Sequence, residues 1–75
     1  MYSLFGSDGC HLCDQAYQLV EQLQQTAIVT QVDIVEQQEL VQRYGVRIPV
    51  LLCHQTEQEL GWPFTIEQLA EFFQR

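Results

Sequence analysis

The chain has 75 residues, 47% of them hydrophobic, and a formal net charge of −7. This length leaves room for one modest core, so we expect a single domain spanning residues 1–75. The only cations are Arg43, Arg47 and Arg75. Because phosphate binding needs clustered Lys or Arg, the composition excludes nucleic acid as a partner and disfavours anionic membrane surfaces.

We expect neither a membrane span nor an export signal. The apolar runs are far too short to cross a bilayer. The segment Met1–Ser3 carries no basic residue and leads straight into a predicted strand. The default compartment is therefore the cytoplasm, where structural disulfides are rare and a C-x-x-C pair is more often catalytic or metal-binding.

The first third of the chain predicts a strand followed by an amphipathic helix. Tyr2–Phe5 has the length and character of a short strand, and Gly6–Gly9 supplies turn residues. Cys10-His11-Leu12-Cys13 follows, and apolar residues then recur at helical spacing as far as about Gln25. The inner stripe of this helix consists of Leu12, Ala16, Leu19, Val20 and Leu23.

The middle of the chain predicts a second strand and a short helix. Ala27–Val35 is apolar on both faces, which indicates a strand with cover on both sides. A helix connects it to the first strand, so the two strands should be parallel. Glu36–Tyr44 has helical spacing, with Gly45 as its C-terminal cap. Its expected inner residues are Leu40, Val41 and Tyr44.

The last third predicts a hairpin and a final helix. Pro49 opens the apolar run that ends at Cys53, and proline belongs at the start of a strand because it cannot donate to the ladder. A turn at His54–Glu57 leads to a short strand over about Gln58–Leu60. Thr65–Gln68 has the pattern of a capping box. It opens a helix to about Phe73, with Ile66, Leu69, Ala70 and Phe73 buried.

Cys10 and Cys13 fall where the first strand ends and the helix begins. The unpaired N–H groups and positive dipole end of a helix start favour a thiolate, which is the reactive form. We expect a protonated His11 to lower the pKa of Cys10 further, and Asp8 and Asp14 to raise it by like-charge repulsion. Cys13 lies one turn along and can close a disulfide with Cys10. The leading hypothesis is dithiol–disulfide exchange in which Cys10 attacks and Cys13 resolves.

Other interpretations of the cysteine pair stay open. The two thiols could be buried apolar groups, or they could bind zinc or an iron–sulfur cluster together with Cys53, His11 or His54. Cys53 lies within an apolar strand, where a small core residue is the simpler interpretation. Trp62 and Phe64 are interpreted as packing for the last helix.

The element order β-α-β-α-β-β-α, with a C-x-x-C at the first strand-to-helix turn and Ile48-Pro49-Val50 before the third strand, resembles the thioredoxin fold. The stretches Leu4–Cys13 and Tyr44–Leu51 are similar to the small glutaredoxin-like proteins, a branch without the extra N-terminal strand and helix of thioredoxins. The resemblance covers essentially the whole chain. It implies an α/β fold of glutaredoxin type, a four-stranded mixed sheet with helices on both faces.

The resemblance also implies a thiol–disulfide oxidoreductase that serves electron transport and acts on protein or glutathione mixed disulfides. It identifies Cys10 as the nucleophile, Cys13 as the resolving cysteine and Pro49 as a cis-proline beside the disulfide. The backbone of Ile48 would pair with the bound thiol partner. Arg47 would either hold a carboxylate of glutathione or of a protein partner, or be a solvated surface residue.

We expect no required cofactor, with glutathione as one candidate reductant. The expected partner is a thiol or disulfide substrate, and the expected state is a monomer. The alternative function is a thioredoxin-fold module that binds a partner or a metal, zinc or iron–sulfur, without redox turnover.

Overall fold

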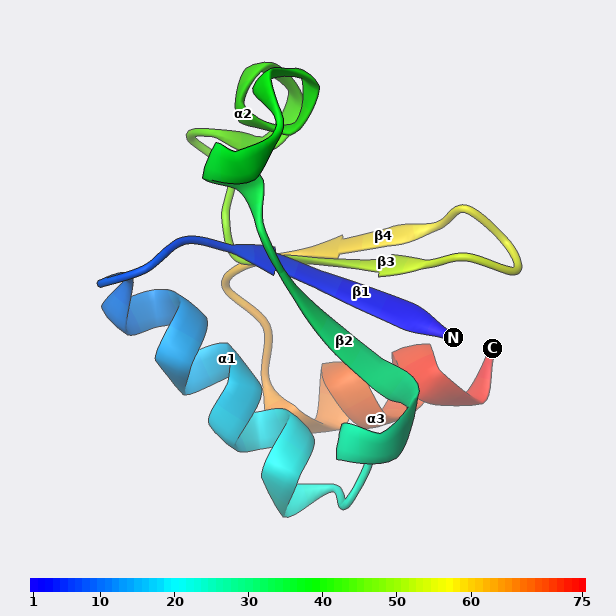
Figure 1. Cartoon of the computed structure of the whole chain (residues 1–75). Coiled ribbons are helices and arrows are strands. Elements are labelled where there is room, and N and C mark those ends of the chain that lie inside the picture. The colour runs from blue at the N-terminus through cyan, green and yellow to red at the C-terminus, as the bar shows by residue number, and fades with distance from the viewer.

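The computed structural model describes residues 1–75 as a four-stranded mixed sheet between two layers of helices (Figure 1). The strands are β1 (Tyr2–Gly6), β2 (Val29–Asp33), β3 (Val50–Cys53) and β4 (Glu59–Gly61). The helices are α1 (His11–Gln22), α2 (Gln38–Tyr44) and α3 (Ile66–Gln74), and short 3₁₀ turns, Thr26–Ile28 and Ile34–Glu36, flank β2. The predicted element order and fold class are confirmed.

The sheet has the strand order β2-β1-β3-β4. β1 is parallel to β2, as predicted, and antiparallel to β3, which is in turn antiparallel to β4. Phe5 pairs with Val50 and Tyr2 with Cys53. The end of β1 that leads to the cysteines therefore lies beside the start of β3, one residue after Pro49.

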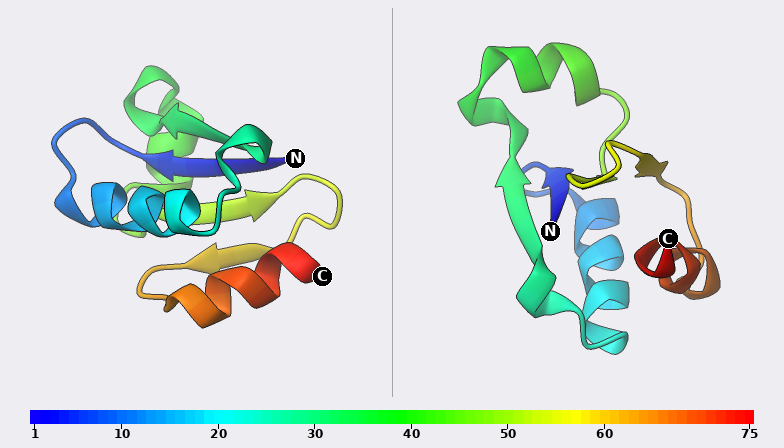
Figure 2. Two further views of the ribbon diagram at one scale, coloured as in Figure 1. Left: turned by 90° about the horizontal axis from the view of Figure 1, so that it is seen from below. Right: turned by 90° about the vertical axis from the view of Figure 1, so that its right-hand side faces the viewer.

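Each face of the sheet has its own core. On one face α1 and α3 lie side by side, and on the other α2 stands alone (Figures 1 and 2). The larger core, under α1 and α3, includes the fully buried Val20, Leu51 and Leu69. Burying side chains of this size contributes about 1.5–3 kcal/mol each. The smaller core, under α2, consists of Phe5, Ile34, Tyr44 and Val50.

α1 ends at Gln22, before the predicted end near Gln25. Gln24 has a left-handed backbone with φ of 58°. Its N–H donates to the carbonyl of Glu21 at 2.9 Å, and the N–H of Gln25 donates to the carbonyl of Val20 at 3.1 Å. This pair of bonds is the Schellman arrangement, which closes the helix.

β2 is shorter than the predicted strand Ala27–Val35 because both of its ends wind into 3₁₀ turns. The Asp33 carboxylate accepts a hydrogen bond from the N–H of Val35 at 3.0 Å and turns the chain out of the sheet. Val35 is consequently 65% exposed, so its predicted place in the sheet is wrong.

α2 begins at Gln38, later than the predicted Glu36, and Gly45 is its C-terminal cap as expected. Tyr44 is buried and Leu40 is half-buried, as predicted. The predicted inward position of Val41 is wrong, because this short helix covers little of the sheet and leaves Val41 exposed.

The capping box at the start of α3 is confirmed, with reciprocal hydrogen bonds between Thr65 and Gln68 of 2.8 and 3.1 Å. Leu69 is buried as predicted, whereas Ile66, Ala70 and Phe73 are only half-buried, and Phe72, which the spacing does not single out, is buried. Phe72 and Phe73 both contact the Tyr2 ring, with centroids 6.0 and 4.9 Å away. No helix has both the length and the apolar character that crossing a membrane requires.

Candidate functional site

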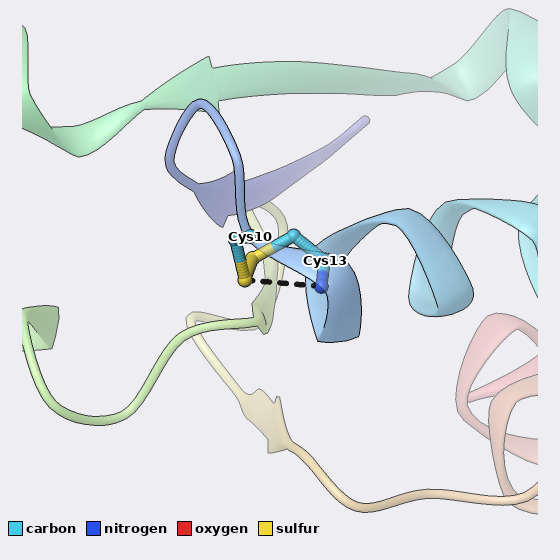
Figure 3. The surroundings of a disulfide bond; sticks show 2 residues. All are labelled: Cys10 and Cys13. Carbon is cyan, nitrogen blue, oxygen red and sulfur yellow. Dashed lines mark hydrogen bonds between the residues drawn. A yellow bond between two sulfur atoms is a disulfide. The ribbon is translucent and has the colours of Figure 1, made fainter.

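Cys10 and Cys13 form a disulfide at the start of α1 (Figure 3). Their Cα atoms are 5.2 Å apart. Cys10 is the N-cap of the helix, and its sulfur accepts a hydrogen bond from the backbone N–H of Cys13 at 3.1 Å. Both residues are partly exposed, so the predicted pair lies open to solvent at a helix start.

The turn between β1 and α1 sets this geometry. Gly9 has a φ of 77°, a conformation that suits glycine, and the N–H of Cys10 donates to the carbonyl of Ser7 at 3.3 Å. The carbonyl of Cys10 then accepts the first helical hydrogen bond, from Asp14 at 3.1 Å. A helix N-cap usually carries Ser, Thr, Asp or Asn, and here a sulfur takes that role.

The same geometry favours negative charge on Cys10 after reduction. The N–H of Cys13 is already directed at its sulfur, and the positive end of the α1 dipole lies there. His11, the first residue of α1, is exposed, as are Asp8 and Asp14. The tuning of the Cys10 pKa by His11 stays a prediction.

Gly6 brings the end of β1 against the disulfide. A methyl group built on Gly6 would lie 2.9 Å from Sγ and 3.1 Å from Cβ of Cys13. Phe5 pairs with Val50 at the end of the ladder, so Gly6 follows, and Pro49 precedes, the same residue pair. The Ile48–Pro49 peptide bond is cis, as the resemblance implied, and the β1–β3 register brings it to the turn that holds the cysteines. Trp62–Pro63 is a second cis bond that the sequence did not indicate.

Arg47 is engaged within the protein. Its Nη2 lies 2.7 Å from Oε1 of Glu59 on β4, and the Tyr44 hydroxyl donates to Oε2 of the same carboxylate at 2.7 Å. The hydrogen bond from Tyr44, reinforced by Arg47, lowers the pKa of Glu59. Burial, and then the bond to Glu59, raises the pKa of Tyr44. The sequence predicts either a substrate carboxylate or solvent as the surroundings of Arg47. It does not predict Glu59, because no local sequence pattern connects residues 12 apart.

A cleft of about 190 Å³ opens beside Cys13. It lies against β1 and β2, and Asp14 and Asp33 contribute carboxylates to its lining. The other lining residues are Leu4, Gly6, Ser7, Gln31 and Val32.

The remaining cysteine and histidine lie elsewhere. Cys53 is buried and pairs with Tyr2, at the opposite end of β1 from the disulfide. Hydrogen bonding to Thr56 lowers the pKa of the Cys53 thiol. His54 Nε2 lies 2.6 Å from Oγ of Ser3, near that same end. The residues therefore do not fit a metal centre that joins Cys53 or His54 to the cysteine pair, and no cluster of three or more metal-ligating side chains occurs.

Phe64 is buried in the larger core and Trp62 packs against it, with ring centroids 5.0 Å apart. The interpretation of these two aromatic residues as packing for the last helix is confirmed. Leu12, between the two cysteines, is 44% exposed rather than part of the helix's inner stripe.

The sequence model of the Glutaredoxin-like domain (DUF836) matches residues 2–74. The chain is similar to the X-ray structure of the structural genomics target XcR50 from X. campestris, with a TM-score of 0.88 and 34% identity over 99% of this chain and 96% of that one. The solution structure of XcR50 gives a TM-score of 0.85 and 36% identity over 97% and 91%. Ne2328 from Nitrosomonas europaea shares the fold, with a TM-score of 0.77 and 23% identity over 95% and 87%. Among proteins of curated function, none matches.

Proposed function

The chain belongs to the family of glutaredoxin-like domains (DUF836), and on this premise we propose that it is a thiol–disulfide oxidoreductase that uses Cys10 and Cys13. The observation that carries the proposal is the hydrogen bond from the Cys13 N–H to the Cys10 sulfur at an exposed helix start. The Cys10 sulfur accepts this hydrogen bond in the disulfide, and it would accept a stronger one as a thiolate because the acceptor is then charged.

The proposed reaction begins with the reduced protein, in which Cys10 is a thiolate and Cys13 a thiol. Cys10 attacks one sulfur of a substrate disulfide, forms a mixed disulfide and releases the first substrate thiolate. Cys13 then loses its proton and attacks the Cys10 sulfur, which releases the second half of the substrate. Two electrons pass from the protein to the substrate. The Cys13 proton goes to one substrate thiolate and the other takes a proton from water, so the Cys10–Cys13 disulfide and two substrate thiol groups result.

Further roles follow from the family as proposals. The Ile48 backbone, next to the cis Pro49, would pair with the bound substrate, and His11 would favour the Cys10 thiolate. The substrate would be a protein or glutathione mixed disulfide, handled in the cytoplasm by a monomer without a required cofactor.

The test is a single-turnover reaction of the reduced protein with bis(2-hydroxyethyl) disulfide, followed by mass spectrometry. Every variant carries Cys53→Ser so that only the pair can react. We expect the parent to lose two hydrogens and Cys13→Ser to retain one half of the disulfide on Cys10. Cys10→Ser should form no mixed disulfide at a comparable rate. Reaction of Cys10 no faster than a free thiol would overturn the proposal, and added metal mass that stays bound would favour the binding module.

A further inference from the structure

We propose that Glu59 determines specificity at this site: it holds the Arg47 guanidinium away from the Cys10–Cys13 disulfide, so that the site discriminates against anionic disulfides. The inference rests on the proposed function and narrows its class of substrate to neutral or cationic disulfides, which favours protein disulfides over those of the net anionic glutathione. It follows from the position of Arg47, the direction in which Glu59 draws it, and the charges around the cysteines.

Arg47 is the cation closest in sequence to Ile48 and Pro49, the proposed substrate-binding segment. It precedes Pro49 by two residues, a stretch that spans at most about 7 Å. Pro49 immediately precedes Val50, which pairs with Phe5, and Phe5 is followed by Gly6, where a built methyl group would lie 2.9 Å from Sγ of Cys13. The Arg47 side chain is 49% exposed. A guanidinium in this place is suited to binding the carboxylate of a substrate docked on the disulfide.

Glu59 draws this guanidinium toward the other end of the sheet. β3 begins at Val50, level with the disulfide turn, and Glu59 pairs with Leu52, which lies about 7 Å farther along the strand. The ion pair measures 2.7 Å, and the Tyr44 hydroxyl fixes the second carboxylate oxygen. Arg47 also donates to the Arg43 carbonyl at 3.4 Å. Glu59 therefore binds the Arg47 guanidinium that an anionic substrate would need.

Apart from His11, which lies between the two cysteines in sequence, the ionisable side chains beside the disulfide are carboxylates. Asp8 and Asp14 are exposed on either side of the cysteines in sequence, and Asp33 lines the cleft beside Cys13. The other nearby cation, Arg43, lies over the Tyr44 ring, 5.6 Å from its centroid. An anionic disulfide therefore meets repulsion, whereas a cationic or neutral disulfide does not.

The test compares single-turnover rates of the reduced protein with three small disulfides: cystamine, which is cationic, bis(2-hydroxyethyl) disulfide, which is neutral, and 3,3′-dithiodipropionate, which is anionic. We expect the wild type to react in that order of decreasing rate. Glu59→Gln should raise the anionic rate relative to the neutral rate about fivefold, the effect of one unit charge about 4 Å away in water. Glu59→Ala, which removes the same charge without adding an amide, should reproduce the gain.

Three further variants identify the cause. Arg47→Gln in the Glu59→Gln background should abolish the gain, and Arg43→Gln in the same background should preserve it. Glu71→Gln is the matched control, because it removes the same formal charge from the exposed pair of Glu71 and Arg75 on α3. It should leave the rate ratio unchanged.

Two outcomes would overturn the specificity role. In one, the Glu59 variants slow all three disulfides equally, which indicates a structural role alone. In the other, Glu71→Gln gives the same gain as Glu59→Gln, which indicates an effect of net charge. If the wild type reacts with none of the three disulfides, the proposed function itself fails, and that outcome is distinct from both of these.

Discussion

At Gly6, the lack of a side chain allows the end of β1 to lie against Cys13. A methyl group there would meet Sγ at 2.9 Å and Cβ at 3.1 Å. We expect Gly6→Ala to destabilise the oxidised protein by about 1–3 kcal/mol, as for other overpacked positions. The loss of folding stability should be smaller in the reduced protein, because the free Cys13 sulfur can rotate away from the added methyl group. Urea denaturation of both forms measures the difference.

Gly61→Ala is the matched control for this substitution, because a methyl group built on Gly61 meets no atom within 4 Å. It should change the free energy of unfolding much less than Gly6→Ala, and equally in the two redox forms. A loss at Gly6 that is the same with and without the disulfide would show that contact with the Cys13 sulfur is not its cause.

The sequence predicts those residues of the site whose positions depend on contacts close along the chain, and not the others. Cys10 and Cys13 could be predicted because one turn of helix fixes their separation, and Pro49 because its segment carries a family pattern. Glu59 and Tyr44 could not be predicted, because their hydrogen bond joins residues 15 apart and depends on α2 packing over the sheet. Phe5 stacks on Tyr44 at 4.4 Å and sets that packing, which no spacing rule reveals.

At the scale of elements, the end of α1 depends on a residue poorly suited to its conformation. Gln24 takes a φ of 58°, and a left-handed backbone costs an L-residue about 1–2 kcal/mol. Glycine takes this conformation freely but loses more entropy on folding. We expect Gln24→Gly to raise the free energy of unfolding by about 0.5–1 kcal/mol, measured by urea denaturation.

Gln18→Gly serves as the comparison, because Gln18 is exposed in the interior of α1. Glycine there should lower the free energy of unfolding by about 1 kcal/mol. The two substitutions are chemically identical and differ only in backbone conformation. If both lowered stability alike, the left-handed geometry at Gln24 would not limit the helix.

The sequence predicts the end of an element only where local contacts determine it and the residues involved have strong conformational preferences. The sequence predicts the start of α3 because Thr65 and Gln68 bond to each other across one turn. The sequence does not indicate the end of α1, because the left-handed residue there is Gln rather than Gly or Asn. The predicted strand is longer than β2 because the apolar pattern continues through Val35, whereas Asp33 already turns the chain out of the sheet.

At the scale of the whole molecule, the charge of −7 leaves few carboxylates with a cationic partner. The two ion pairs differ in burial: the side chain of Glu59 is 21% exposed and that of Glu71 is 72% exposed. Exposed pairs contribute little to stability. The bond network of Glu59, which ties β4 to α2 through Tyr44, should therefore contribute more of the pH-dependent stability.

The sign of that contribution follows from the pKa of Glu59, which the Tyr44 hydrogen bond and Arg47 lower below its ordinary 4.5. The unfolded chain then binds the proton more readily than the folded protein, so stability rises with pH. The contribution is fully present above about pH 4.5 and is lost as the pH falls through the folded value. Tyr44 changes stability in the opposite direction, because its pKa is raised above 10.0. Its contribution to the free energy of unfolding is present below pH 10.0 and is lost as the pH rises through the folded value.

We therefore expect the difference in free energy of unfolding between wild type and Glu59→Gln to be constant at neutral pH and to shrink on acidification below about pH 4.5. Urea denaturation from about pH 3 to 8 measures it. Glu71→Gln, which makes the same formal change in the exposed pair on α3, should give a much smaller difference throughout. A Glu59 difference that persists undiminished at the acid end would mean that its carboxylate charge does not hold β4 to α2.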